Sequence, residues 1–238
     1  MPRSPGGATV RGMSCCSHCR DAEGFFGGRT ARRELRRYRK RGPPTSTRRL
    51  LDALREKGVE GRTLLDVGGG VGMIQLELLD EGLRSALHID ASRPYLEVAE
   101  KALTEAGHGE RTTRRFGDFV ELVAQDPDVP AAEIVTLDRV ICCYPRLAAL
   151  LEASVHCTRE RLGLVYPRER VGTRVALAIG NLWFRIRRSD FRAYLHPPDQ
   201  VHRILEAHGF RRTRSDRTFI WQVEVWEPAD GPGGSTPD

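Results

Sequence analysis

The chain of 238 residues predicts a doubly wound α/β fold on a mostly parallel, seven-stranded sheet. From residue 63 onward, short apolar segments alternate with segments of helical periodicity, which is typical of a parallel sheet covered on both faces. A glycine-rich turn follows the first apolar segment, and two strand-like segments stand together near the end. With 39% hydrophobic residues, this length is enough for one domain with a substantial core.

Two cap helices are expected before the alternation begins. The first covers 30–40, where arginines surround one apolar side made of Ala31, Leu35 and Tyr38. Gly42-Pro43-Pro44 ends this helix, and a second one starts near Thr45 or Thr47 and stops at Gly58. We therefore expect cap helices over 25–60 and the main domain over 61–227. The flanking segments 1–24 and 228–238, rich in Gly, Pro and Ser, are expected to be disordered.

Within the main domain, the patterns place each strand and helix in turn. The predicted strands are 63–67, 85–90, 111–116, 133–140, 162–166, 211–217 and 219–226. The predicted helices are 71–83, 92–106, a short one after Asp118, 146–160 and 198–208. The last two strands follow each other closely, so they form an antiparallel C-terminal hairpin.

An insert over 171–198 interrupts this alternation. Its apolar residues run from Val175 to Ile186. Arg185 lies within the end of this run, and Arg187 and Arg188 follow it. We expect the segment to form a helix that packs on the sheet or on a dimer partner. The alternative is a lid that lines a pocket for a hydrophobic acceptor.

The segment Leu64–Gly72 predicts a buried strand that enters a glycine-rich turn, where bare backbone can lie against a ligand. The spacing differs from a dinucleotide fingerprint, because Met73 occupies the position of the third glycine. No Gly-Lys-Ser/Thr follows, which excludes a P-loop. The pattern is D-x-G-x-G-x-G, beginning at Asp66.

Three further acidic segments follow in order. Asp90 ends the second strand 18 residues beyond Gly72, Asp118-Phe119 follows the third, and Asp138-Arg139 ends the fourth. Over residues 60–227 this order resembles the class I S-adenosylmethionine-dependent methyltransferases. The resemblance implies a Rossmann-like fold closed by a hairpin strand, with S-adenosyl-L-methionine as cofactor. It implies cofactor contacts from Asp66, Gly68, Gly69, Gly70, Asp90, Asp118, Phe119, Asp138 and Arg139.

The acids also have a simpler interpretation. Asp90 could be the N-cap of the helix near Ser92, and Asp118 could cap the helix that starts at Phe119. Their order behind the glycine turn favours the ligand-binding interpretation.

The methyl acceptor is predicted less sharply than the cofactor. A sulfonium methyl is already activated, so the enzyme has to align donor and acceptor and exclude water. Tyr144 and His196 are the candidate residues on the acceptor side. The predicted acceptor is a small, apolar organic molecule. Within that class, a diffuse likeness to the magnesium-protoporphyrin O-methyltransferase branch suggests only a large, apolar, acidic acceptor.

Two other functions stay open. Ten Lys and Arg residues but one acid, Glu34, lie between Arg29 and Arg49, so this segment could bind RNA in an RNA methyltransferase. No Asn-Pro-Pro-Tyr-type motif follows the fourth strand, which makes nucleic acid the less favoured partner. A non-catalytic protein that binds S-adenosylmethionine is the third hypothesis. The oligomeric state is left open.

The cysteines predict a reducing, cytoplasmic environment rather than a disulfide scaffold. No signal peptide or membrane span is expected. Cys142 and Cys143 are expected to be packing residues, because nothing nearby lowers their pKa. Near the N-terminus, one cluster offers a weak candidate for a metal site, although only one ligand knuckle is visible: Cys15, Cys16, His18 and Cys19.

Overall fold

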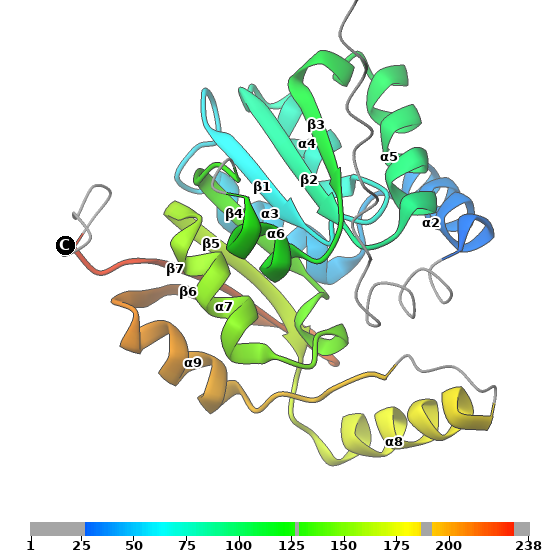
Figure 1. The fold of residues 1–238 in the computed structure, drawn as a ribbon, viewed down its shortest axis with the longest axis vertical. Helices are drawn as coiled ribbons and strands as arrows, with labels where there is room; N and C mark the ends of the chain where they lie inside the picture. The colour runs from blue at the N-terminus through cyan, green and yellow to red at the C-terminus, as the bar shows by residue number, and fades with distance from the viewer. Residues whose placement is uncertain (1–26, 127–128, 187–191, 231–238) are drawn as a thin grey trace, which may run out of the picture.

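The computed structural model describes residues 27–126, 129–186 and 192–230, which form a seven-stranded sheet of order β3-β2-β1-β4-β5-β7-β6 (Figure 1). Strands β1 to β5 are parallel, β7 is antiparallel to β5, and β6 is antiparallel to β7. The predicted fold class is therefore confirmed. The strands are β1 Thr63–Val67, β2 Ser85–Asp90, β3 Thr112–Phe116, β4 Ala132–Asp138, β5 Thr158–Pro167, β6 Phe210–Arg217 and β7 Trp221–Pro228.

Helices cover both faces of the sheet (Figure 1). They are α2 Gly28–Arg41, α3 Thr45–Arg55, α4 Met73–Asp80, α5 Arg93–Glu105, α6 Phe119–Gln125, α7 Leu147–His156, α8 Val171–Ile186 and α9 Pro198–Ala207, with short 3-10 helices η1 Gly109–Arg111 and η2 Ile141–Cys143. Successive strand residues enter opposite cores: Leu64 packs with α2 to α5, whereas Leu65 packs with α6, α7 and α9.

The boundary between α7 and β5 differs from the prediction. The helix expected over 146–160 ends at His156, and β5 already starts at Thr158. The reason is Arg161, a buried strand residue whose guanidinium donates to the carbonyls of Leu54 (2.5 Å) and Gly58 (2.7 Å). This arginine satisfies carbonyl groups at the end of α3, so a charged residue occupies a core position that a hydrophobic pattern does not reveal.

The insert and the last turn also depart from expectation. The predicted helix in the insert is confirmed as α8, but α8 lies beside the domain rather than on the sheet (Figure 1). Phe219, expected at the start of the last strand, precedes β7 and is exposed in the β6–β7 turn. Segment 1–24 and the part of the C-terminal tail from 231 to 238 lie outside the described residues.

The strand order places the site. The order reverses between β1 and β4: the chain continues from β1 to β2 on one side and from β4 to β5 on the other. At such a reversal, a crevice opens at the carboxyl ends of the two central strands. The cap helices reach this edge because α3 packs against β5 and β7. Among the described residues, none of the helices combines the length and the hydrophobicity that a membrane-spanning helix requires.

Candidate functional site

A cavity of about 250 Å³ lies at the carboxyl ends of β1, β2 and β4. The α2 residue Glu34 lines one side of it, and Tyr144, which follows η2, lines another. Its lining also includes every residue predicted to contact the cofactor: Asp66, Gly68, Gly69, Gly70, Asp90, Asp118, Phe119, Asp138 and Arg139. Segments separated by more than half of the described chain therefore meet at one site.

The turn after β1 presents bare backbone to the cavity. Gly68 and Gly70 have φ angles of 61° and 58°, which side chains rarely tolerate. A Cβ atom on Gly69 would lie 2.5 Å from Oδ2 of Asp66, so this position has no room for a side chain. The glycines are thus required by the backbone path and by close packing.

Asp66 lies beneath this turn and is almost fully buried. Its Oδ2 accepts from Nε2 of Gln75 (3.0 Å), and its Oδ1 accepts from the Thr136 hydroxyl (2.7 Å). Burial raises the pKa of Asp66, and these two hydrogen bonds oppose that shift only in part. The carboxyl group therefore supports the turn from below.

Asp90 holds the turn from the side. Its Oδ2 accepts from the backbone N–H of Gly70 (3.1 Å) and its Oδ1 from that of Ser92 (2.8 Å). The N-cap of α5 is Ser92, whose hydroxyl accepts from the N–H of Tyr95. The interpretation of Asp90 as that cap is therefore wrong, and its carboxylate lies at the cavity wall.

Asp118 does cap a helix, as the simpler interpretation proposed. Its Oδ1 accepts from the N–H groups of Val120 (2.9 Å) and Glu121 (3.2 Å) at the start of α6. The same oxygen accepts from the Tyr144 hydroxyl at 2.7 Å. Burial and the Asp118 carboxylate both raise the pKa of Tyr144. The neighbouring Phe119 is buried and contributes an apolar wall.

The turn after β4 carries the charged pair Asp138 and Arg139. Oδ2 of Asp138 accepts from the Thr47 hydroxyl of α3 (2.5 Å), and Oδ1 lies 3.3 Å from Nε of Arg139. Burial lowers the pKa of Arg139, but the carboxylates of Asp138 and Glu34 outweigh this effect and raise it overall. Among non-glycine residues of the described chain, Arg139 alone has a positive φ, 64°.

Among the lining residues that the sequence did not predict, Glu34 and Tyr95 are the two polar ones that contact each other. The Tyr95 hydroxyl of α5 donates to Oε2 of Glu34 on α2 at 2.9 Å, so this hydrogen bond joins the cap helix to the main domain. Glu34 was the single acid within the basic segment 29–49, which was the available signal. Its position in the cavity could not follow from that segment alone.

His196 lies near the cavity but does not line it. Its Nε2 is 3.0 Å from the carbonyl oxygen of Tyr144. A carbonyl can only accept, so Nε2 carries a proton and donates. The N–H of Tyr194 donates to the carbonyl of Cys142 (2.7 Å), and both contacts fasten the segment after α8 to η2.

The two adjacent cysteines differ. Cys142 is buried, whereas Cys143 lines the cavity. The expectation that nothing lowers their pKa is wrong for Cys143: a hydrogen bond with Cys142 and the charge of Arg139 lower the pKa of its thiol. No metal-binding group of His, Cys, Asp or Glu occurs among the described residues. The cluster Cys15, Cys16, His18 and Cys19 lies outside them.

No protein-family model matches the chain, and no curated protein matches it in sequence. Solved structures do match. Magnesium protoporphyrin IX methyltransferase from Synechocystis PCC 6803, with bound SAH, superposes with a TM-score of 0.66 and 20% identity, covering 87% of this chain and 97% of that one. The same protein with bound SAM gives 0.64 and 17%, covering 90% and 99%. The chain has the fold of the class I S-adenosylmethionine-dependent methyltransferases.

Other proteins with this methyltransferase fold differ in function. An O-methyltransferase family protein from Burkholderia thailandensis matches at a TM-score of 0.63 and 16% identity, over 79% of this chain and 57% of that one. The cyclase SpnF matches at 0.59 and 15%, over 78% and 81%. The fold thus hosts more than one reaction, and function has to be argued from the cavity.

Proposed function

We propose that this protein is an S-adenosylmethionine-dependent methyltransferase acting on a small, apolar organic acceptor. The observation that carries the proposal is the cavity itself. There, the bare turn Gly68–Gly70 meets the carboxylates of Asp90 and Asp118 at the reversal of strand order. These are the donors and acceptors that a nucleoside with a charged sulfonium tail requires.

The residues present fit this cofactor. The absence of side chains in the turn leaves room for the cofactor against the main chain. Each oxygen of Asp90 accepts one backbone N–H, and a carboxylate offers about four acceptor sites, so ribose hydroxyls can still donate to it. Asp118 and Phe119 would hold the adenine, one by its carboxylate and the other by its ring. When bound, the cofactor supplies an activated methyl group.

The acceptor side of the cavity is shaped for positioning rather than for proton abstraction. The Tyr144 hydroxyl donates to Asp118, and burial together with that carboxylate moves its pKa still further above neutral pH, so it does not act as a base. Nε2 of His196 is committed to a backbone carbonyl. Val140, Cys143 and Leu150 supply apolar wall. The protein would therefore accelerate the reaction by alignment and exclusion of water.

The test is cofactor affinity after changing Asp90. In Asp90→Ala, we expect S-adenosylmethionine to bind at least about tenfold more weakly in calorimetry, because a charged hydrogen-bond acceptor is lost. Asp90→Asn keeps one oxygen acceptor and should lose less. Asp80→Ala is the matched control, because Asp80 pairs with His108 at 2.7 Å outside the cavity.

Far-UV circular dichroism and thermal unfolding would establish that the variants are folded. Wild-type affinity in folded Asp90→Ala would contradict the proposed cofactor site. For catalysis, purified protein would be incubated with S-adenosylmethionine and candidate acceptors, and S-adenosylhomocysteine measured by mass spectrometry. Tight binding without product for any retained metabolite would favour the non-catalytic alternative.

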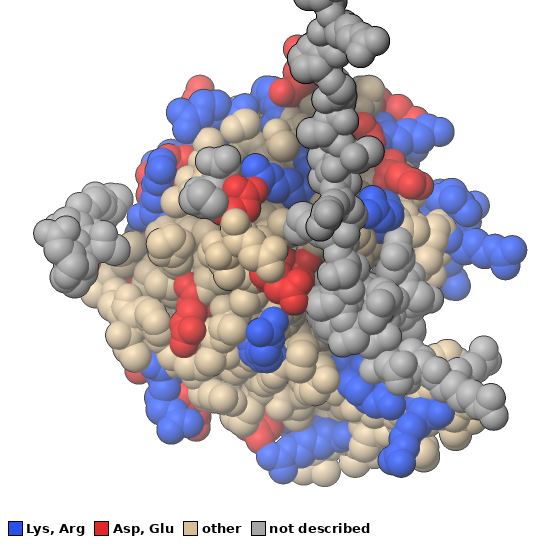
Figure 2. All heavy atoms as spheres, viewed as in Figure 1, with Lys and Arg blue, Asp and Glu red and all other residues tan. Residues whose placement is uncertain are grey.

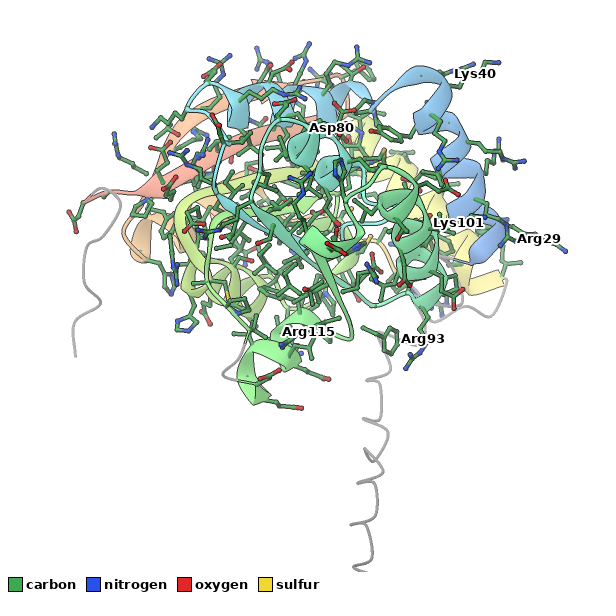
Figure 3. All side chains as sticks on the ribbon, turned by 90° about the horizontal axis from the view of Figure 1, so that it is seen from above. Arg29, Lys40, Asp80, Arg93, Lys101 and Arg115 are labelled. Carbon is green, nitrogen blue, oxygen red and sulfur yellow. The ribbon has the colours of Figure 1, made fainter. Side chains whose placement is uncertain are left out.

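One observation favours RNA as a second candidate acceptor. Most of the basic residues of α2 are exposed, and Figure 3 shows Arg29 and Lys40 near its two ends, with both side chains directed away from the domain. The opposite side of the helix reaches the cavity through Glu34. Retention of RNA on a gel at low salt, weakened in Arg36→Glu/Arg37→Glu, would support this candidate. No retention would remove it.

A further inference from the structure

The outward side of α8 is an apolar stripe in contact with solvent. Val171, Val175, Ile179, Leu182 and Ile186 are between 53% and 78% exposed. Their spacing of three and four residues puts them on one side of the helix. They form a continuous surface along the 16 residues of α8.

The opposite side of α8 already has contacts. Phe184 is buried, and the Asn181 side chain exchanges two hydrogen bonds of 2.8 Å with the backbone of Ala193. The helix therefore packs on the segment that follows it, and its exposed stripe is a second apolar side. An ordinary surface helix has only one.

The apolar surface continues onto the β6–β7 turn. Phe219 and Ile220 are both exposed there, and the N–H of Arg168, which precedes α8, donates to the carbonyl of Ile220 at 2.8 Å. Within the described residues, every exposed large hydrophobic side chain belongs to α8 or to this turn. Such concentration marks an interaction surface rather than scattered exposure.

Arginines border this surface. Desolvation, and then the charges of the nearby Arg170 and Arg217, lower the pKa of Arg168. Arg174 and Arg185 stand eleven residues apart on one flank of α8, where Glu169 pairs with Arg174. Figure 2 shows basic side chains gathered along the lower edge of the molecule, around α8.

We propose that α8 and the β6–β7 turn, together the α8 surface, dock this protein on an anionic lipid bilayer. An amphipathic helix with apolar residues on one side and arginines beside them lies in the membrane interface without spanning it. Negative headgroups would neutralise the arginines while acyl chains cover the stripe. A two-fold dimer through the same surface would place these arginines near their own copies, which disfavours a second chain as the occupant.

The α8 surface is fastened beside the cavity. Tyr194 and His196, in the segment after α8, bond to the backbone of Cys142 and Tyr144. Docking would thus bring the cavity near the bilayer, where an apolar acceptor partitions. The docking itself does not depend on the proposed methyl transfer.

The experiment is sedimentation of the full chain with vesicles, without cofactor. We expect binding to phosphatidylcholine vesicles that contain phosphatidylserine and little binding to phosphatidylcholine alone. Ile179→Glu/Leu182→Glu should abolish binding, whereas Ile179→Leu/Leu182→Ile should preserve it. Arg170→Glu/Arg185→Glu should weaken binding by about tenfold or more, because each basic residue near an anionic surface contributes about fivefold in affinity.

Arg36→Glu/Arg37→Glu on α2 is the matched control for charge, and it should bind vesicles like the wild type. Loss of binding in this control but not in the α8 variants would overturn the proposal, as would equal binding to neutral vesicles. Absence of vesicle binding, with a wild-type dimer that Ile179→Glu/Leu182→Glu dissociates in light scattering, would assign the surface to a second copy instead. S-adenosylmethionine affinity, measured in parallel, tests the proposed function separately.

Discussion

The turns after β1 and β4 face the same cavity but are built in opposite ways. The β1 turn is made of glycines, with positive φ angles at Gly68 and Gly70, and backbone alone forms its surface. The β4 turn places a side-chain-bearing residue, Arg139, in the same region of backbone conformation. The two turns touch, because a Cβ on Gly68 would lie 2.6 Å from Cγ2 of Val140.

The two turns differ in what the left-handed backbone conformation requires of the residue that adopts it. Glycine adopts the left-handed conformation without strain, so the β1 turn is stable as a bare cradle. Arginine adopts it at a cost, which the ion pair with Asp138 and the surrounding packing must offset. The conformation of the β4 turn therefore depends on contacts such as the Arg139–Asp138 ion pair, whereas glycine alone permits that of the β1 turn.

The largest expected effect is at Gly69. Gly69→Ala forces a methyl group against Asp66 and Gln75, so we expect the free energy of unfolding to fall by about 2 kcal/mol and cofactor affinity to fall with it. Gly180→Ala in α8 is the control, since nothing lies within 4 Å of the added methyl group. It should stabilise the helix slightly. Urea denaturation of both variants is the measurement. Equal losses of stability would contradict the argument that the backbone of the β1 turn has no room for a side chain.

Asp66→Asn tests whether the β1 turn needs a charge beneath it. The pKa of Asp66 is raised in the folded protein, so the folded state holds the proton more tightly than the unfolded state. Wild-type stability therefore falls as pH rises above the ordinary carboxyl pKa of about 4. The neutral variant lacks this loss and should be more stable at pH 7, by on the order of 1 kcal/mol.

Denaturation of the Asp66→Asn variant and the wild type at pH 5 and pH 8 is the measurement. The Asn amide can still accept from Thr136, and a flipped Gln75 amide can accept from it, since Oε1 of Gln75 has no partner in the structure. A steeper pH dependence in the variant than in the wild type would contradict the argument.

Arg139 distinguishes backbone strain from side-chain contact. Arg139→Gly and Arg139→Ala both remove the guanidinium from Asp138, but only glycine relieves the φ of 64°. We expect the glycine variant to be more stable than the alanine variant by about 1 kcal/mol in denaturant titrations. Equal stabilities would show that the β4 turn relaxes and that the contrast between the turns is small.

The smallest expected effect concerns Tyr144. Tyr144→Phe removes the hydrogen bond to Asp118, which keeps two backbone donors, so stability should fall by about 0.5 kcal/mol. Tyr38→Phe removes a similar bond to Glu77 of 3.0 Å, away from the cavity. Both variants should lose similar stability in thermal melts, but only Tyr144→Phe should change methyl transfer. Identical turnover in the two would remove Tyr144 from the acceptor site.

Local sequence predicted those parts of the molecule in which neighbouring residues act together. The glycine turn and the acids after β2, β3 and β4 all lie within a few residues of a strand end, and the parallel sheet brings strand ends to one edge. Spacing was therefore enough to place Asp90 and Asp138 in the same cavity.

The contributions that were not predicted depend on contacts between distant segments. Glu34 reaches the cavity because α2 packs on α5, and Arg161 is buried because α3 ends against β5. Periodicity identified α8 as apolar, but the pattern does not tell which side of a helix is covered or by what. The exposure of the stripe depends on the tertiary structure and not on the periodicity.

The position of α3 has a consequence for how the protein folds during translation. Arg49 of α3 pairs with Asp216 of β6, and Lys57, just after this helix, pairs with Glu227 of β7. These partners are synthesised more than 160 residues later. During translation α3 therefore reaches these partners only after nearly the whole chain has emerged, whereas α2 can already pack on α5 through Glu34 and Tyr95.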